Sequence, residues 1–272
     1  MSSNPLPLII EPDALQAQLG QTNVLIADLC KPEVYARTHL PGAVHLDYMQ
    51  VIAAFNPGMG LLPGETQLSE LFSSIGMTPG THVVAYDDEG GGRAARLLWT
   101  LEMIGHRSYA LLNGGIHAWA AENRPLTAEA AAPPRSRYPV TIQGEAGADK
   151  PYILEHLNDP GVVLLDCRSP AEYAGRKSFA RRAGHIPGAV NFEWTNAIDP
   201  QRALRLRPAQ EIGPALRGLG VSPEKEVITY CQTHHRSAHT YIVLKSLGYE
   251  KIKGYAGSWS EWGNDLETPV EQ

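Results

Sequence analysis

Short apolar runs recur along the chain and alternate with segments of helical periodicity. The runs are rich in Val, Ile, Leu and Ala and have no polar face, as expected of strands in a parallel sheet covered on both sides. They predict strands at 23–28, 81–87 and 109–115, and again at 161–166, 225–231 and 252–257. Amphipathic patterns that end at glycine predict helices over 68–76 and 237–248. The expected fold class is therefore α/β, with mostly parallel sheets flanked by helices.

The second half of the chain repeats the first. The segment "VLIADLCKPEVYA" matches "VVLLDCRSPAEYA", which places Asp28 opposite Asp166 at a separation of 138 residues. The segment "HLPGAVHLD" matches "HIPGAVNFE" 146 residues later, and Asp87 lies opposite Cys231, 144 residues away. An ordered series of such matches indicates two tandem copies of one domain, and a period this long means that each copy folds alone.

The matches predict a domain over 1–123 and a second domain over 149–272. Residues 124–148 are rich in Ala, Pro and Gly and lack an apolar period, so we interpret them as a linker. The length of 272 residues suits two domains of ordinary size. Hydrophobic residues make up 43% of the chain and charged residues 19%, which is typical of a globular protein and not of a disordered one.

The net charge of −6 argues against binding to nucleic acids or to anionic membranes. The longest apolar runs are too short to cross a bilayer, and the N-terminal segment lacks the basic and apolar regions of a secretory signal. We therefore expect a cytoplasmic protein that does not interact with membranes. Its three cysteines, Cys30, Cys167 and Cys231, form no CxxC motif and are an unsuitable set for a disulfide framework.

Cys231 begins the six-residue segment "CQTHHR" between a predicted strand and a predicted helix. Ligands bind at the carboxyl ends of strands in open α/β sheets, and loop amides beside a helix N-terminus favour an anion there. A thiol in that position is expected to ionise easily. Arg236 adds a permanent positive charge, and His234 and His235 add charge when protonated. The loop therefore predicts a nucleophilic cysteine next to a receptor for an anionic substrate.

Two tandem α/β domains, an "HxPGAV" motif in each, the "CQTHHR" loop and a "GxxxxW" motif near the end of each copy resemble the rhodanese sulfurtransferases. The loop is similar to that of bacterial two-domain thiosulfate sulfurtransferases, and the resemblance covers essentially the whole chain. It implies that Cys231 becomes a persulfide and that no other cofactor takes part. It also implies a set of substrate-binding residues around the sulfur: Gln232, Thr233, His234, His235, Arg236, Trp194, Arg176 and Arg182.

The reaction implied by the resemblance has two steps. The Cys231 thiolate takes the outer sulfur of thiosulfate while sulfite leaves, and the persulfide then passes sulfur to a thiophilic acceptor such as cyanide, another thiol or a protein. Two alternatives stay open: 3-mercaptopyruvate as the donor, and a persulfide carrier for a protein partner. A cysteine-dependent phosphatase or arsenate reductase is disfavoured, because only four residues separate Cys231 from Arg236.

Several other residues have simpler interpretations. Asp87 takes the place of the cysteine in the first copy, and because a carboxylate cannot carry a sulfane sulfur, that domain is predicted to be catalytically silent. Cys30 and Cys167 are predicted to be small packing residues. The spacing of the histidines around Cys231 matches no common zinc motif, so no metal is expected. Which of His234 and His235 faces the sulfur is left open.

Overall fold

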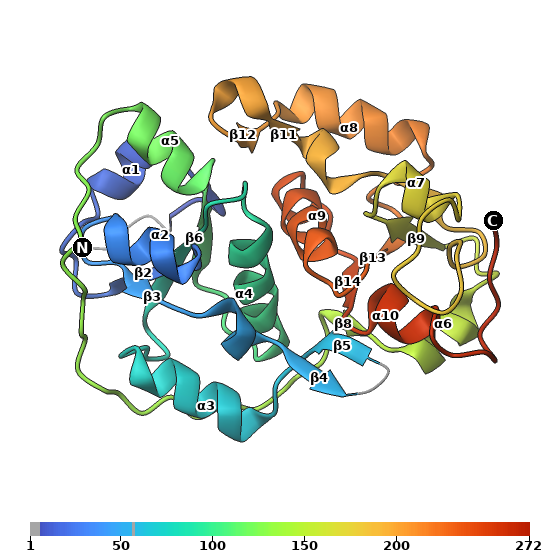
Figure 1. Cartoon of the computed structure of the whole chain (residues 1–272), viewed down its shortest axis with the longest axis horizontal. Helices are drawn as coiled ribbons and strands as arrows, with labels where there is room; N and C mark the ends of the chain where they lie inside the picture. Colours follow the sequence, from blue (N-terminus) through green and yellow to red (C-terminus); the bar gives the residue numbers. More distant parts are fainter. Residues whose placement is uncertain (1–5, 56–57) are drawn as a thin grey trace. The chain divides into compact units, whose positions relative to one another are not determined.

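The computed structural model describes residues 6–55 and 58–272 and divides into two compact units (Figure 1). The first unit consists of the residues up to Val51 together with Pro63–Gln143 and Asp199–Leu206. The second unit consists of Ile52–Leu62, Gly144–Ile198 and Arg207–Gln272. Each unit thus includes a short segment whose neighbours in sequence belong to the other unit.

The first unit is built on a five-stranded parallel sheet with the strand order β1-β7-β6-β2-β3. Its elements, in chain order, are β1 (Ile9–Ile10), α1 (Pro12–Gln16), β2 (Val24–Asp28), α2 (Pro32–Arg37), β3 (Val44–His45), the 3-10 helix η1 (Tyr48–Val51), α3 (Glu65–Ser74), β6 (His82–Tyr86), α4 (Gly92–Met103), β7 (Tyr109–Leu112), α5 (Gly115–Ala121), the 3-10 helix η3 (Pro200–Arg202) and β12 (Arg205–Leu206).

The second unit contains a five-stranded parallel sheet with the order β10-β9-β13-β14-β8. Its elements are the hairpin strands β4 (Ala53–Phe55) and β5 (Gly58–Leu61), then β8 (Gly147–Ala148), α6 (Lys150–His156), β9 (Val162–Asp166), α7 (Pro170–Tyr173), β10 (Val190–Asn191), the 3-10 helix η2 (Trp194–Ala197), α8 (Ala209–Gly218), β13 (Glu226–Tyr230), α9 (Arg236–Ser246), β14 (Ile252–Tyr255) and α10 (Ser258–Trp262). The boundary between the units falls within the two-residue strand β11 (Ile198–Asp199).

The two sheets have the same topology. Read from the opposite edge, the second order becomes β8-β14-β13-β9-β10, which corresponds strand by strand to β1-β7-β6-β2-β3. The central pair has the same register in both units, since Val24 pairs with His82 and Val162 with Glu226. The α/β class, the parallel sheets and the tandem repeat predicted from the sequence are confirmed.

The "HxPGAV" histidines make the same structural contacts in both units. His39 is stacked on Tyr35 with ring centroids 3.9 Å apart, and His185 is stacked on Tyr173 at 3.7 Å. The Nδ1 atom of each histidine lies within hydrogen-bonding distance of the carbonyl of that tyrosine, at 2.7 and 2.9 Å. Each ring therefore connects its "HxPGAV" turn to the end of a preceding helix, as a structural hydrogen-bonding group.

Each unit has its own apolar core. In the first, strand residues such as Ile26 and Val84 pack with Trp119, and in the second, Leu164 and Ile228 pack with Trp262. The two tryptophans, which end the repeated "GxxxxW" motifs, are fully buried and donate their indole N–H to the carbonyls of residues 125 and 269, respectively. Both faces of each central strand are covered, which explains why the apolar runs in the sequence have no polar face.

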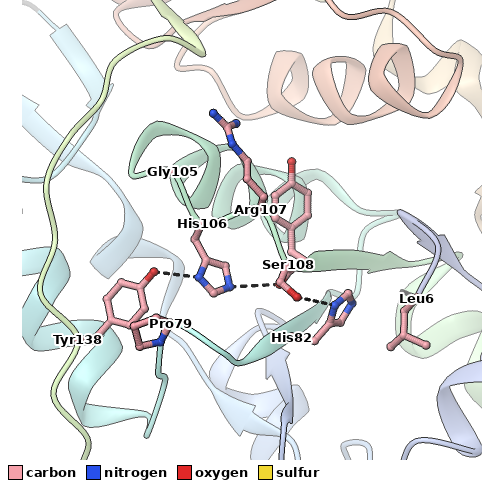
Figure 2. A pocket seen from close by; sticks show the side chains of 9 residues that line it. Leu6, Pro79, His82, Gly105, His106, Arg107, Ser108 and Tyr138 are labelled. Carbon is pink, nitrogen blue, oxygen red and sulfur yellow. Dashed lines mark hydrogen bonds between the residues drawn. The ribbon is translucent and has the colours of Figure 1, made fainter. Parts of the chain in front are cut away.

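A pocket of about 460 Å³ lies in the first unit at the amino ends of β6 and β7 (Figure 2). There the hydroxyl of Tyr138 lies 2.9 Å from Nδ1 of His106, and Nε2 of the same ring lies 3.0 Å from the carbonyl oxygen of Thr81. His82 lies 2.9 Å from the hydroxyl of Ser108, and burial lowers the pKa of both histidines. These groups connect the starts of two strands, at the sheet edge opposite the loop that follows β6.

Candidate active site

The six residues 231–236, called the cysteine loop below, connect the end of β13 to the start of α9. β13 is the central strand of its sheet, so the loop emerges from the middle of the carboxyl edge. His234 has a positive φ of 53°, which turns the loop back toward the first turn of the helix. The N-terminus of the eleven-residue helix α9 therefore lies close to the thiol of Cys231, where its partial positive charge favours an anion.

The thiol of Cys231 is fully buried but ionises more easily than an ordinary cysteine. Burial alone would raise its pKa; the charge of Arg236 and hydrogen bonds from the Ser237 hydroxyl, the Ser237 amide and the Thr233 amide outweigh that effect and lower the pKa to about 7. Roughly half of the Cys231 side chains are then thiolates at neutral pH. The loop therefore holds a reactive nucleophile.

Arg236 is fixed by a buried carboxylate. Its two terminal nitrogens lie 2.7 and 2.8 Å from the two carboxylate oxygens of Glu172 in α7, a bidentate pair. Glu172 is only 3% exposed and also accepts hydrogen bonds from the amide and hydroxyl of Ser169, with which it forms a capping box. Burial opposes ionisation of Glu172, but these donors lower its pKa to about 2, so the carboxylate stays charged.

Glu172 is a site residue that the sequence reasoning missed. The repeat itself carries the signal, because position 34, which matches 172 at the separation of 138, is a valine, and position 92, which matches 236 at the separation of 144, is a glycine. The glutamate and the arginine are thus both absent from the matched positions of the copy that lacks the cysteine; Glu33 and Arg93 lie one residue away. Residues that differ together with the nucleophile are candidates for a shared role.

His234 connects to the sulfur of Cys231 through Ser237. The His234 ring is fully buried, and its Nδ1 lies 2.8 Å from the hydroxyl of Ser237, which in turn donates to Cys231. His235 is only partly buried, and its ring centroid lies 5.9 Å from that of Trp194. Trp194 also meets His239 edge-to-face at 5.2 Å. The structure therefore brings Trp194 next to the loop, in contact with His235, while His234 contacts Ser237.

The two candidate arginines of the 176–182 segment lie in different surroundings. Arg182 directs its guanidinium to the carbonyls of Trp262 and Thr268, at 3.0 and 2.6 Å, and so connects this segment to the C-terminal part of the chain. Arg176 is exposed. The segment reaches the cysteine loop through Phe179, whose carbonyl accepts a hydrogen bond of 3.4 Å from the side chain of Gln232.

The other two cysteines are buried free thiols. Burial raises the pKa of Cys30, and the neighbouring carboxylate of Asp28 raises it further. Burial also raises the pKa of Cys167 well above its usual value. Both therefore remain protonated and poorly nucleophilic at neutral pH. Within residues 6–55 and 58–272, no group of three or more His, Cys, Asp and Glu side chains is arranged to hold a metal ion.

In the first unit, the carboxylate of Asp87 occupies the position that matches the thiol. It is fully buried and accepts hydrogen bonds from the amides of Glu89 at 3.0 Å, Gly91 at 2.8 Å and Ala94 at 3.0 Å. Burial raises its pKa, and the nearby charge of Glu89 adds to that effect. The loop amides of this copy thus bind a carboxyl side chain of the protein itself.

Replacing Asp87 with alanine should destabilise the protein by about 2–4 kcal/mol, because two buried amides and one partly buried amide would lose their acceptor. Chemical denaturation measures the loss. Glu89→Ala is the matched control: it removes a partly exposed ion pair with Arg93 and should change stability by less than about 1 kcal/mol. Equal stabilities of the two variants would contradict this account of Asp87.

The thiol ionises easily, lies in a loop lined with amides at the carboxyl edge of a parallel sheet, and has a fixed arginine beside it. These features are typical of an α/β protein that transfers a chemical group by covalent bonding to a cysteine. A family model described as "Rhodanese-like domain" matches residues 11–122 and 149–265. The chain belongs to the rhodanese-like family and contains two tandem copies of its domain.

Similar proteins agree with this assignment. The chain is 48% identical to proteins named thiosulfate sulfurtransferase from Pseudomonas aeruginosa and from Azotobacter vinelandii, in each case over 98% of this chain and 97% of the relative. It is 33% identical to the sulfur carrier protein TtuD of Thermus thermophilus, over 97% of this chain and 96% of the relative. Solved structures of YnjE (22% identical, TM-score 0.86) and wild-type EanB (20% identical, TM-score 0.86) share the fold; the match covers 97% of this chain and 68% and 69% of theirs.

Among the residues that the structure describes, none of the helices is both long enough and apolar enough to span a membrane.

Proposed function

We propose that this chain is a thiosulfate sulfurtransferase that carries sulfane sulfur as a persulfide on Cys231. The observation that supports the proposal most directly is the placement of Cys231 between the end of β13 and the start of α9, beside an Arg236 that Glu172 holds in position. The charge of Arg236 and the hydrogen bonds from Ser237 and Thr233 outweigh burial and lower the pKa of the thiol to about 7. The names of the two relatives that are 48% identical support the same reaction.

In the first half-reaction, the Cys231 thiolate attacks the outer sulfur of thiosulfate. A bond forms between Sγ and that sulfur, the sulfur–sulfur bond of thiosulfate breaks, and sulfite leaves with the bonding electron pair. No proton and no external oxidant is needed. The terminal sulfur of the persulfide inherits the negative charge, and Arg236 and the amide donors of the loop stabilise it.

In the second half-reaction, a thiophilic acceptor attacks the terminal sulfur and the Cys231 thiolate leaves. With cyanide as acceptor the product is thiocyanate, and with a thiol it is a new persulfide. Because Cys231 is fully buried, donor and acceptor reach the sulfur only when the side chains around the loop move aside. His235 in the loop and Trp194 beside it are partly buried, so their side chains are suited to such movement.

The reaction as proposed uses no cofactor besides the persulfide, and it uses small anionic donors and nucleophilic acceptors, not nucleic acids or membranes. A thiol nucleophile must stay reduced between turnovers, so we place the reaction in the cytoplasm. A second role, passing the persulfide to a protein, is favoured by the 33% identity to a protein named sulfur carrier protein.

Thiosulfate should be a better donor than 3-mercaptopyruvate by at least about tenfold in kcat/KM, because thiosulfate is a compact dianion that suits the amides and Arg236. A 3-mercaptopyruvate carboxylate would need a cation further from the sulfur, and Arg182 already binds backbone carbonyls. Steady-state kinetics on one preparation, with cyanide as the acceptor, measure both values. A higher kcat/KM for 3-mercaptopyruvate would overturn the choice of donor.

The persulfide itself should be found on Cys231 after treatment with thiosulfate alone. Peptide mapping by mass spectrometry should show the mass of one added sulfur atom on the peptide that contains Cys231, and cyanide should remove it. Cys30 and Cys167 serve as internal controls, because their raised pKa values predict no added sulfur. Sulfur on either of them, and none on Cys231, would refute the assignment.

A further inference from the structure

The hairpin formed by β4 and β5 contacts the cysteine loop of the second unit, although it precedes that loop by about 170 residues in sequence. Gly60 in β5 has a φ of +88°, and a Cβ atom added there would lie 2.2 Å from the carbonyl oxygen of Thr233. The close approach and the left-handed backbone both require glycine at this position. The hairpin backbone therefore lies directly against the backbone of the loop.

The hairpin is also hydrogen-bonded to α10. The hydroxyl of Ser260 accepts from the amide of Met59 at 3.0 Å, and its own proton can go to the carbonyl of Met59 at 3.0 Å or of Gly257 at 2.7 Å. The hydroxyl is thus fixed by the hairpin on one side and by the start of α10 on the other.

The same serine fixes the peptide that faces the sulfur. The Ser260 amide donates to the carbonyl of Gln232 at 2.9 Å. In a trans peptide the C=O and the N–H point in opposite directions, so holding the Gln232 carbonyl directs the Thr233 amide the other way. That amide is one of the groups that hydrogen-bond to Cys231 and lower its pKa.

The rest of the loop is anchored to α10 in the same manner. The hydroxyl of Ser258 accepts from the amides of Cys231 at 3.2 Å and His234 at 3.1 Å, and the Trp259 amide donates to the Cys231 carbonyl at 2.9 Å. Ser258 has a positive φ of 50°, an unfavourable conformation for serine that its contacts with the loop offset. One face of the loop is therefore bonded to α10, and the carbonyl of Thr233 touches the hairpin.

We propose that Gly60 and Ser260 are positioning residues: the β4–β5 hairpin and α10 together hold the loop backbone so that the Thr233 amide points at the Cys231 sulfur. The inference rests on Cys231 being the nucleophile of the proposed function. The hairpin would thereby set the reactivity of the thiol through the backbone of the cysteine loop.

Gly60→Ala tests this proposal. The new methyl group would displace the Thr233 carbonyl by nearly an ångström before an acceptable contact is reached, and the adjacent Thr233 amide would move with it. A hydrogen bond from an amide to a thiolate would be weakened or lost, and we expect the pKa of Cys231 to rise by about one unit. The kcat for sulfur transfer at pH 7 should fall about tenfold or more, with a smaller change in KM for the donor.

Gly58→Ala is the matched control in the same hairpin. The atoms nearest to its added methyl group would belong to the flexible side chain of Leu61, at 3.2 Å and beyond. The pKa is measured by ultraviolet absorbance of the thiolate, as the difference between each variant and the same variant with Cys231→Ala. This readout requires neither a sulfur donor nor access of a reagent to the thiol, so it does not depend on whether thiosulfate is the substrate.

A folded Gly60→Ala variant with the titration of the wild type would overturn the proposal, as would an equal shift in Gly58→Ala. If Gly60→Ala does not fold, Ser260→Ala decides the question. It removes the hydrogen bonds to Met59 without adding an atom, and should raise the Cys231 pKa in the same direction by a smaller amount. An unshifted titration in Ser260→Ala would then reject the positioning role.

Discussion

Cys231→Ala should lower the rate of sulfur transfer at least about a thousandfold while leaving the fold intact, because alanine cannot form the persulfide on which the proposed reaction depends. The side chain of Cys231 is small and fully buried, so its truncation should reduce the free energy of unfolding by only about 1–2 kcal/mol. Thiocyanate production from thiosulfate and cyanide measures the activity, and circular dichroism verifies the fold.

Cys30→Ala provides the matched comparison. Cys30 is a buried thiol just after β2 in the first unit. Its pKa is raised, so it is not expected to act as a nucleophile in sulfur transfer. This variant should keep nearly full activity per folded molecule. If Cys231→Ala retained measurable turnover, or if Cys30→Ala lost it, the thiol of Cys231 would not be the nucleophile.

The sequence alone was sufficient for the architecture because the repeat is redundant. Each predicted strand occurs twice, and runs such as 161–166 and 225–231 are apolar on both faces, as expected of strands in a covered parallel sheet. The observed strands β9 and β13 fall inside those two ranges. The helix predicted over 237–248 is observed one residue earlier, as α9 (Arg236–Ser246).

The chemistry of the loop was predictable for a different reason. A cysteine after a parallel strand and before a helix is placed among amides by local geometry, so its residues act within a few positions of one another. By contrast, Glu172 lies 64 residues before Arg236 and is brought to it only by the pairing of β9 with β13. No local pattern of charges indicates that contact.

The contact between the β4–β5 hairpin and the cysteine loop could not be predicted from the sequence either, because it also joins segments that are far apart in the chain. Gly60 is one of 26 glycines, and nothing in its neighbours shows that it meets Thr233. The roles of His234 and His235 could not be separated either, since the positive φ of His234 decides which ring turns toward Ser237. The hairpin contact depends on the approach of two distant backbone segments, and the orientation of the His234 ring depends on one dihedral angle. Neither produces a periodic pattern of hydrophobic and polar residues in the sequence.

The pair formed by Arg236 and Glu172 leads to the second large expected effect. Arg236→Ala should raise the pKa of Cys231 from about 7 to 9 or above, because the charge of Arg236 is the largest of the influences that lower it. The thiolate fraction at pH 7 would fall from about one half to about one hundredth, and sulfite would leave without a nearby cation. We expect kcat/KM for thiosulfate to fall by about 100–1,000-fold at pH 7.

Glu172→Gln separates charge from geometry. The glutamine keeps the size of the side chain and leaves the positive charge of Arg236 in place, but it removes the bidentate ion pair that fixes the guanidinium. The positive charge of Arg236 remains near the thiol in this variant, so the pH midpoint of activity should move less than it does in Arg236→Ala. The activity should nevertheless fall about tenfold, because the guanidinium is no longer held in position.

The two variants are therefore distinguished by the pH profile of kcat/KM, measured between pH 5 and 10. The activity of a thiolate nucleophile rises with pH through its pKa, so Arg236→Ala should recover part of its lost activity above pH 9, whereas Glu172→Gln should not. The ionised Glu172 carboxylate stabilises the fold, because its pKa is lower in the folded than in the unfolded chain. The wild type therefore loses this part of its free energy of unfolding between pH 4.5 and about 2. Glu172→Gln should lack this contribution at every pH. Equal pH midpoints in Arg236→Ala and the wild type would show that Arg236 does not act on the sulfur through its charge.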